Sequence, residues 1–412
     1  MRSQPDGSVI SIFRSVMGFE KPLWVICITH MFIDIFSLTH LALIPVYVRE
    51  FQLGLFEASF VATIPSLTQL LMNVPSGLLA HRFNAKHLLT TSMMIEGVSA
   101  LFISQTSNFW LLTLAVSVLR ISSPVFHVSG LSHLSRLVSF DRTSRSIGLH
   151  GALGSLGSAM GVVSLAFFLS TVGWRWAYLF WAFPVLAWGF IMSVSSQPET
   201  RVLEEQHVDI KGRPKRLMAT FSLELTTFLV VIALREVGIT SISTFMTTYL
   251  VRMRSLSEAT ASLIFGLGPF VGIVGSLNSG YLGEKLDPKR ALGVTIAGCA
   301  ISLSLLAISS QLYLLTSVYL LYRFFSDSVW VPMNTIVAHI TPGAGRELGF
   351  GAYLFIEGFM MSIVPIAAAK VIELSNVWYV FPFSIVFLGM SLFVLQLLPY
   401  SRRGTSISLG MR

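Results

Sequence analysis

The sequence predicts an all-α membrane protein whose twelve transmembrane helices form two pseudo-symmetric six-helix bundles, and three observations lead to this fold class. Of the 412 residues, 53% are hydrophobic and only 12% are charged, whereas soluble domains carry about 25% charged residues. Apolar runs of about 20 residues, the length that crosses a bilayer, recur along the whole chain. Sequence features of the first half also return in the second half. This composition excludes an ordinary soluble enzyme.

Six apolar segments precede a long polar stretch and six follow it. We place them near residues 23–47, 57–80, 88–106, 109–132, 147–171 and 175–195, and near 217–249, 259–281, 291–309, 312–338, 348–372 and 376–398. The polar stretch, Gln197–Arg216, divides the chain into an N-terminal bundle (1–198), a cytoplasmic linker (199–216) and a C-terminal bundle (217–412). The N-terminus lacks the short apolar core and small-residue cleavage site of a signal peptide, so we expect a retained anchor.

Lysine and arginine concentrate in alternate loops. If the N-terminus is cytoplasmic, the loops and tails on that side hold 20 of the 28 Lys and Arg residues, and the opposite loops hold four. Because positive loops remain in the cytoplasm, we expect a multi-pass protein of the cell inner (plasma) membrane with both termini cytoplasmic. The net charge of +8 then follows from topology, and we expect no nucleic-acid partner. Cys27 and Cys299 are far apart and offer no disulfide framework or metal-ligand spacing.

The two halves resemble one another in matching segments. The second segment ends in "GLLAHRFNAK" and the eighth in "GYLGEKLDPKR", while the fourth carries "LRISSPVFH" and the tenth "YRFFSDSVW". Many secondary transporters are built by such duplication, with the site between the halves near the membrane midplane.

The chain as a whole resembles the major facilitator superfamily. The signature loop of that family has a glycine, an acid–Arg pair and a basic residue, and the first copy here keeps all but the acid, which His81 replaces. The second copy keeps the pattern better. The resemblance implies a conformational latch on the cytoplasmic side, in which glycine lets two helices approach and the charges hold them; its expected residues are Gly77, Arg82, Gly280, Glu284 and Lys285.

Within the superfamily, the likeness is to the fosmidomycin resistance protein subfamily. The matching stretches are "THMFIDIFSLTHLALIPVYVREFQL", "NVPSGLLAHRF", "ISSPVFHVSG" and "GLHGALGSLGSAMG". This resemblance implies a secondary exporter of small toxic compounds driven by protons that move inward.

Asp34 and His30 are polar residues inside the first apolar segment, one helical turn apart. An ionised side chain near the bilayer centre costs about 2.5–3.5 kcal/mol, so embedded acids usually serve a function. We interpret Asp34 as a proton-binding carboxylate, with His30 sharing or orienting its proton. The alternative is a structural hydrogen bond.

Arg120 and His127 share a face of the fourth segment. In the superfamily an arginine here belongs to a motif associated with proton coupling, so Arg120 is a candidate for coupling or, with His127, for substrate binding. A fixed ion pair between helices is the alternative.

The tenth segment carries a polar stripe at spacings of four, three and four residues: Arg323, Asp327, Trp330 and Asn334. We predict one continuous face, either a cavity wall with a tryptophan platform for substrate or an intrahelical Arg–Asp bridge. Glu236 on the seventh segment is a candidate second proton site, and Glu357 on the eleventh a candidate substrate contact. Glu96 is expected to be structural.

Glycines recur in the fifth segment, from Gly148 to Gly161. This run lacks the strand and the Lys-Ser/Thr ending of a phosphate loop, and small residues at such spacing let membrane helices pack closely.

No nucleophile elbow, zinc motif or nucleotide loop is found, so we expect a monomeric transporter, not an enzyme, with no cofactor or metal. Our hypothesis is alternating access with proton-coupled export of a small toxic or drug-like molecule; substrate, protons and the lipid bilayer are the expected partners. One rival is a proton-coupled uptake symporter for an organic anion clamped by Arg120 and Arg323. A non-transporting sensor is a second rival, although no added soluble domain is visible.

Overall fold

The computed structural model describes residues 21–127, 130, 140–195, 222–341 and 346–399, and every regular element in these ranges is a helix. The first half contains α2 (Lys21–Asp34), α3 (Thr39–Ala42), α4 (Ile44–Glu50), α5 (Leu55–Arg82), α6 (Ala85–Gln105), α7 (Phe109–Leu119), α9 (Phe140–Thr171) and α10 (Trp174–Val194). The second half contains α12 (Leu223–Arg254), α13 (Glu258–Lys285), α14 (Pro288–Ile308), α15 (Leu312–Asp327), α16 (Trp330–Ile340), α17 (Arg346–Glu373), the 3₁₀ helix η2 (Val377–Tyr379) and α18 (Val380–Leu397).

Eleven helical runs among the described residues are long and apolar enough to cross a membrane. They correspond to eleven of the twelve predicted segments. The remaining segment, 312–338, is present as two helices, α15 and α16, separated at Ser328 and Val329. The predicted all-α membrane fold is therefore confirmed. The linker 199–216 lies outside the described residues, so the exact domain limits stay a prediction.

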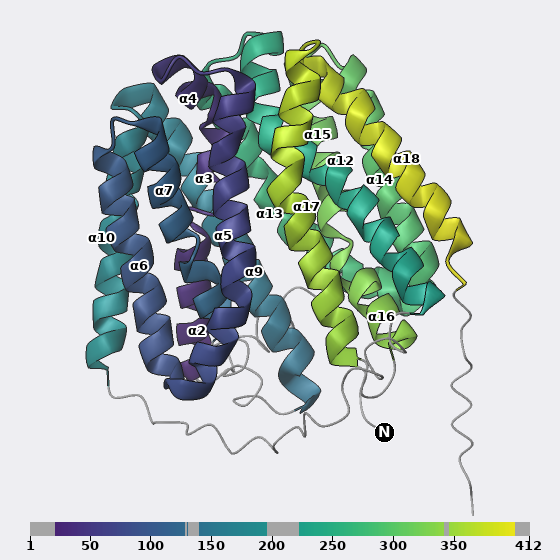
Figure 1. Cartoon of the computed structure of the whole chain (residues 1–412), viewed down its shortest axis with the longest axis horizontal. Coiled ribbons are helices and arrows are strands. Elements are labelled where there is room, and N and C mark those ends of the chain that lie inside the picture. The colour runs from purple at the N-terminus through teal and green to yellow at the C-terminus, as the bar shows by residue number, and fades with distance from the viewer. Residues whose placement is uncertain (1–20, 128–129, 131–139, 196–221, 342–345, 400–412) are drawn as a thin grey trace, which may run out of the picture.

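The helices of the two halves group on opposite sides of the molecule, and α9, α13, α5 and α17 lie where the groups meet (Figure 1). The halves approach closely at glycines on this seam. A Cβ atom on Gly266 of α13 would lie 3.0 Å from the backbone nitrogen of Val163 in α9, and one on Gly358 of α17 would lie 3.0 Å from Leu70 Cδ1 in α5. Small residues here set the distance between the two halves.

Polar contacts between the halves gather at one end of the bundle, which we call the closed end. Arg49 Nη2 lies 3.0 Å from Glu258 Oε2, and the backbone N–H of Phe56 donates to Glu373 Oε1 at 2.8 Å. Toward the opposite end, where α2 begins and α18 ends, the ribbons of the two halves diverge (Figure 1). We call this the splayed end.

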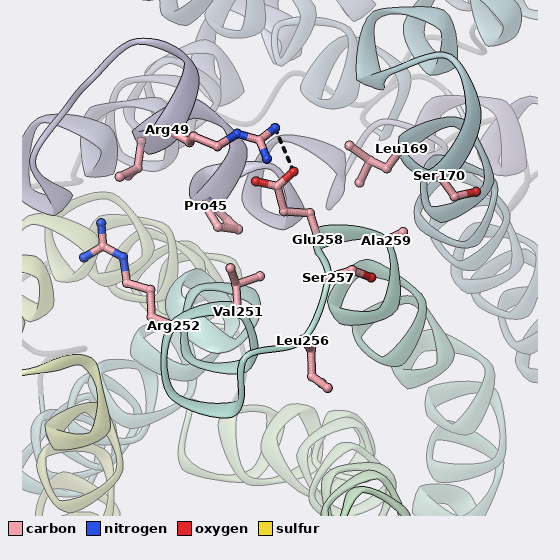
Figure 2. A pocket seen from close by; sticks show the side chains of 11 residues that line it. Pro45, Arg49, Leu169, Ser170, Val251, Arg252, Leu256, Ser257, Glu258 and Ala259 are labelled. Atoms are coloured by element: carbon pink, nitrogen blue, oxygen red, sulfur yellow. Dashed lines mark ion pairs between the residues drawn. The ribbon is translucent and has the colours of Figure 1, made fainter.

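A pocket of about 600 Å³ lies at the closed end, between α4 and the end of α9 on one side and the α12–α13 turn on the other. Figure 2 shows the Arg49–Glu258 ion pair across it, with Arg252 pointing to another side. The pocket thus straddles the contact that closes this end.

Three helices that the sequence predicts as continuous are interrupted. The interruptions follow Asp34 at the end of α2, Leu119 at the end of α7 and Asp327 at the end of α15. In the last two cases a proline, Pro124 or Pro332, lies a few residues beyond the break. Proline has no N–H and its ring clashes with the carbonyl four residues earlier. Other prolines lie inside unbroken helices such as α5 and α13, so proline contributes to these breaks but does not by itself end a helix.

After Asp34 the chain makes a tight turn that Ser37 closes. The Ser37 hydroxyl donates to the Asp34 carbonyl oxygen at 2.7 Å, and the backbone N–H of Ser37 bonds to the same carbonyl at 3.1 Å. The tight turn leaves Asp34 at the C-terminal end of α2, and interrupted membrane helices of this kind make the position a candidate site.

Candidate functional site

The first polar cluster is built on the end of α2. His30 Nε2 lies 3.2 Å from Asp34 Oδ2, and 8% of the His30 side chain and 21% of the Asp34 side chain are exposed. On its other side, the His30 ring donates from Nδ1 to the carbonyl oxygen of His150 in α9, at 2.7 Å. The predicted one-turn neighbours are therefore in contact, and a residue 120 positions later completes the arrangement.

Helix α9 packs on this cluster through glycines. A Cβ atom on Gly154 would lie 2.6 Å from Asp34 Oδ2 and 2.8 Å from His30 Nδ1. Farther along, a Cβ on Gly157 or Gly161 would meet the carbonyl groups of Met31 or Ile35. These contacts confirm close helix packing for the second part of the glycine run, whereas a Cβ on Gly148 or Gly151 would meet nothing within 4 Å.

Three imidazoles gather here. The His30 ring stacks on the His150 ring with centroids 3.9 Å apart and planes at 19°, and its edge contacts His127 at 4.9 Å. One ring nitrogen from each of the three lies within 4.8 Å of the others, a spacing that a metal ion could use. A coordinated ion lies in the plane of each imidazole it binds, along the nitrogen lone pair. Two nearly parallel stacked rings do not direct their lone pairs to one point, so this arrangement does not fit a shared ion.

Arg120 lies at the break after α7. Its guanidinium Nη2 donates to the neutral side-chain oxygen of Gln69 in α5, and Arg120 and His127 are near enough to act electrostatically on Asp34. Glu96 in α6 is fully buried and accepts a hydrogen bond from Ser122 Oγ at 2.6 Å. The structural role that we expect for Glu96 stays a prediction.

The second polar cluster lies at the end of α15. Arg323 Nη2 donates to both carboxylate oxygens of Asp327, at 3.1 and 2.8 Å. As in the first cluster, glycines of a facing helix enclose the pair: a Cβ on Gly268 of α13 would lie 3.0 Å from Arg323 Nε, and one on Gly272 would lie 3.1 Å from Asp327 Cγ.

The segment that carries the predicted stripe is not one continuous helix. The helix is interrupted after Asp327, so Arg323 and Asp327 lie in α15, whereas Trp330 and Asn334 lie in α16. The Trp330 side chain is exposed, and the Asn334 amide donates to the Trp330 carbonyl oxygen at 2.7 Å. The alternative interpretation, an intrahelical Arg–Asp bridge, describes the first two residues.

Glu236 forms a buried ion pair with its neighbour Arg235. Arg235 also donates to the Ser326 carbonyl oxygen in α15, at 3.0 Å, so this pair ties α12 to the residue before Asp327. Glu357 in α17 is half-buried and acts electrostatically on Arg235. The structure thus brings Glu236, Glu357 and the Asp327 region together within the second half.

The predicted latch is described only in part. A Cβ on Gly77 would meet nothing within 4 Å, so in this conformation Gly77 is not a point of close approach, contrary to expectation. The Arg82 side chain is exposed. Gly280, Glu284 and Lys285 lie in α13, but their side chains are outside the part that the structure describes.

The repeated loops have a function that the sequence did not reveal. Lys86 Nζ donates to the Ser195 carbonyl oxygen at 2.7 Å, and Lys289 Nζ donates to the Leu398 carbonyl oxygen at 2.7 Å. Each lysine thus caps the last helix of its own half. A helix C-terminus carries unpaired carbonyl groups and partial negative charge, which a lysine satisfies.

Comparison with known proteins agrees with this architecture. The sequence profile of the Major Facilitator Superfamily matches residues 26–365 and again residues 228–410, and the second match starts within the second half. The chain belongs to the Major Facilitator Superfamily. It is therefore a multi-pass membrane protein of a transporter family, not of an enzyme family.

Relatives within the superfamily differ in what they are named for. The chain is 23% identical over 309 residues to the fosmidomycin resistance protein of Escherichia coli, covering 73% of this chain and 74% of the relative. It is also 23% identical over 279 residues to a probable nitrate transporter, NarT, of Staphylococcus carnosus (66% and 69% covered) and over 270 residues to the nitrite extrusion protein of Bacillus subtilis (65% and 66%). These names leave substrate and direction open.

Solved structures share the fold at low identity. A bacterial homologue of the lysosomal transporter Spinster, in an inward-facing and unoccupied conformation, superposes with a TM-score of 0.76 at 14% identity, over 95% of this chain and 98% of that one. The nucleoside transporter NupG superposes with a TM-score of 0.78 at 14% identity, over 92% and 100%. The superfamily fold is thus present along nearly the whole chain.

Proposed function

We propose that this superfamily member is a proton-coupled exporter of a small toxic or drug-like compound in the cell inner (plasma) membrane. The observation that carries the proposal is the His30–Asp34 pair, a partly exposed acid and a titratable base in contact at a break in a membrane helix. The fosmidomycin resistance protein among its relatives supports export.

The splayed end faces the cytoplasm in this proposal, because alternate loops divide Lys and Arg by 20 to four in favour of that side. The closed end, with the Arg49–Glu258 and Phe56–Glu373 contacts, then faces outward. Asp34 releases its proton toward the cytoplasm, substrate enters, and protonation from outside resets the transporter. Each ligand shifts the population of the two states by its differential affinity.

The competing proposal is uptake of an organic anion held between Arg120 and Arg323. Two relatives named for nitrate and nitrite support an anionic substrate, but the Bacillus subtilis relative is named for extrusion and so does not support uptake. The two arginines are not equivalent, however: Arg323 is engaged by the carboxylate of Asp327, whereas Arg120 meets the neutral amide of Gln69. An anion held by both arginines would therefore share Arg323 with the carboxylate of Asp327.

The test is a reconstitution of the purified protein in liposomes with a trapped pH dye, to which phosphonates, organic anions and cationic drugs are added. A substrate-dependent pH change whose sign corresponds to exchange of proton for substrate supports export. A change of opposite sign, lost in Arg120→Gln, would establish the symporter instead. Isotope flux of a compound without any pH change would exclude proton coupling.

A further inference from the structure

The two ring nitrogens of His30 both face oxygen atoms. Nδ1 lies 2.7 Å from the carbonyl oxygen of His150, and Nε2 lies 3.2 Å from Asp34 Oδ2. A carbonyl oxygen can only accept a hydrogen bond, so the hydrogen in the first contact belongs to Nδ1. The second contact lies between a ring nitrogen and a carboxyl oxygen, and either atom can carry the hydrogen there.

This second contact requires one proton. Without it, the lone pair of a neutral Nε2 would face the lone pairs of an ionised carboxylate, and two acceptors in a largely buried site would repel each other. With one proton, the pair is either imidazolium and carboxylate or imidazole and carboxylic acid, and its net charge is zero in both forms. Loss of the proton leaves a net charge of −1 on the pair.

We infer that the coupling proton is shared between His30 Nε2 and Asp34 Oδ2, and that two backbone features of α9, the His150 carbonyl and the missing side chain of Gly154, position the pair. This inference rests on the proposed proton coupling and names the atoms that hold the proton. His30 is part of the carrier, whereas His150 and Gly154 are positioning residues.

The His150 carbonyl fixes which nitrogen of His30 faces Asp34. A histidine ligand or proton carrier is commonly oriented by a carbonyl or carboxylate on its other nitrogen. If the carbonyl were absent, Nε2–H and Nδ1–H tautomers would both be available, and the ring could turn. Gly154 provides the space, because a Cβ there would lie within 2.8 Å of both members of the pair.

Helix α9 also connects the pair to the other half. It packs on α2, where the pair lies, and on α13 across the seam between the halves. A change of conformation that shifts α9 along α2 would move the carbonyl away from Nδ1. The positioning of the shared proton is therefore set by a helix that also packs against the other half.

Other charged and titratable groups surround the pair. His127 lies beside the His30 ring on the segment after α7, His150 stacks on it from α9, and Arg120 acts on Asp34 from the break after α7. Glu96 of α6 is hydrogen-bonded to Ser122. None of these four lies between Nε2 and Oδ2, so each alters the proton affinity of the pair without holding its proton.

The test combines two readouts on the full-length protein in nanodiscs and liposomes. ¹⁵N-histidine NMR, with signals assigned by His30→Gln, His127→Gln and His150→Phe, reads the protonation of each ring nitrogen across about pH 5–8. We expect His30 Nδ1 to remain protonated throughout, Nε2 to titrate, and the midpoint of that titration to move in Asp34→Asn. His150→Phe retains the carbonyl and a stacked ring, so the His30 titration should remain.

Proton flux with the trapped dye gives the second readout. We expect His30→Gln to shift the pH of half-maximal substrate-dependent flux by about one unit or more, because glutamine donates to Asp34 but cannot take up a proton.

An unchanged pH profile in His30→Gln would overturn the inference while leaving proton coupling intact. An unprotonated Nδ1 would also overturn it, because His30 could then not donate to the His150 carbonyl that is said to position it. So would a stoichiometric Zn²⁺ titration that shifts all three histidine signals, because the ring nitrogens would then serve as metal ligands. Absence of substrate-dependent flux in the wild type would overturn the proposed function instead, and the NMR titration would still decide where the proton lies.

Discussion

The two halves each place an acid at the end of an interrupted helix, with a base one turn earlier and glycines of a facing helix around the pair. In the first half the base is His30 and the acid Asp34; in the second half they are Arg323 and Asp327. Histidine changes charge near neutral pH, whereas arginine stays charged in proteins. The same construction therefore makes a site that can gain and lose a proton in one half and a fixed ion pair in the other.

The largest expected effect is on coupling, in Asp34→Asn. Asparagine removes the carboxyl group that shares the proton, so we expect substrate-dependent proton flux to fall to the level of empty liposomes. The fold should tolerate the change, because His30 can become neutral when its partner loses its charge. Thermal unfolding of the purified variant within a few degrees of wild type is the control. Full flux in Asp34→Asn would assign the proton to another group.

The matching change in the second half, Asp327→Asn, should affect stability. Arg323 cannot lose its charge, and breaking a buried ion pair by removing one partner costs about 3–5 kcal/mol. Because 17% of the Arg323 side chain and 24% of the Asp327 side chain are exposed, we expect the lower limit, about 3 kcal/mol. The difference between the halves is confirmed if Asp327→Asn lowers the melting temperature in detergent while the variant that stays folded still shows substrate-dependent proton flux. An unchanged melting temperature would contradict it.

Part of this comparison could be predicted from the sequence. A spacing of four residues is enough to place His30 near Asp34 and Arg323 near Asp327, because residues one turn apart share a helix face. Hydropathy and loop charge likewise predict the all-helical membrane fold. The sequence predicts an unbroken helix beyond Asp327, and this part was wrong: the helix is interrupted there, and Pro332 favours a break.

The rest of the site depends on contacts between helices that are far apart in sequence. Nothing in the pattern of α2 indicates that the carbonyl of His150 bonds to His30, since every residue has a carbonyl group. The glycine run predicts close packing but not its partner. The lysine caps at Lys86 and Lys289 are hidden in the same way, because the carbonyl oxygens they satisfy lie 109 residues away in each case.

Glycine substitutions in α9 test the positioning of the first pair. Gly154→Ala adds a methyl group within 2.8 Å of His30 and Asp34, and overpacking of this kind costs about 1–3 kcal/mol. We expect a reduced melting temperature together with a large loss of proton flux. The matched control is Gly151→Ala one turn earlier, where a Cβ meets nothing within 4 Å and alanine is favoured over glycine by roughly 0.5–1 kcal/mol in a helix. Equal effects of the two substitutions would exclude a specific role for Gly154.

The smallest effect is expected at the closed end, where the two halves meet through an exposed ion pair. The Arg49 side chain is 71% exposed in its pair with Glu258, and exposed ion pairs contribute about 0–1 kcal/mol. Arg49→Gln should therefore shift the equilibrium between the two conformations by no more than about fivefold.

The opening of this end can be measured by labelling Ala259→Cys in the pocket with a membrane-impermeant thiol reagent. The two native cysteines, Cys27 and Cys299, are buried, and both are replaced by serine so that only the new thiol can react. Arg252→Gln removes a charge from the same pocket that points away from Glu258 (Figure 2), so it should leave the labelling rate unchanged. A rate that rises equally in both variants would mean that net charge in the pocket, and not the ion pair between the halves, holds this end closed.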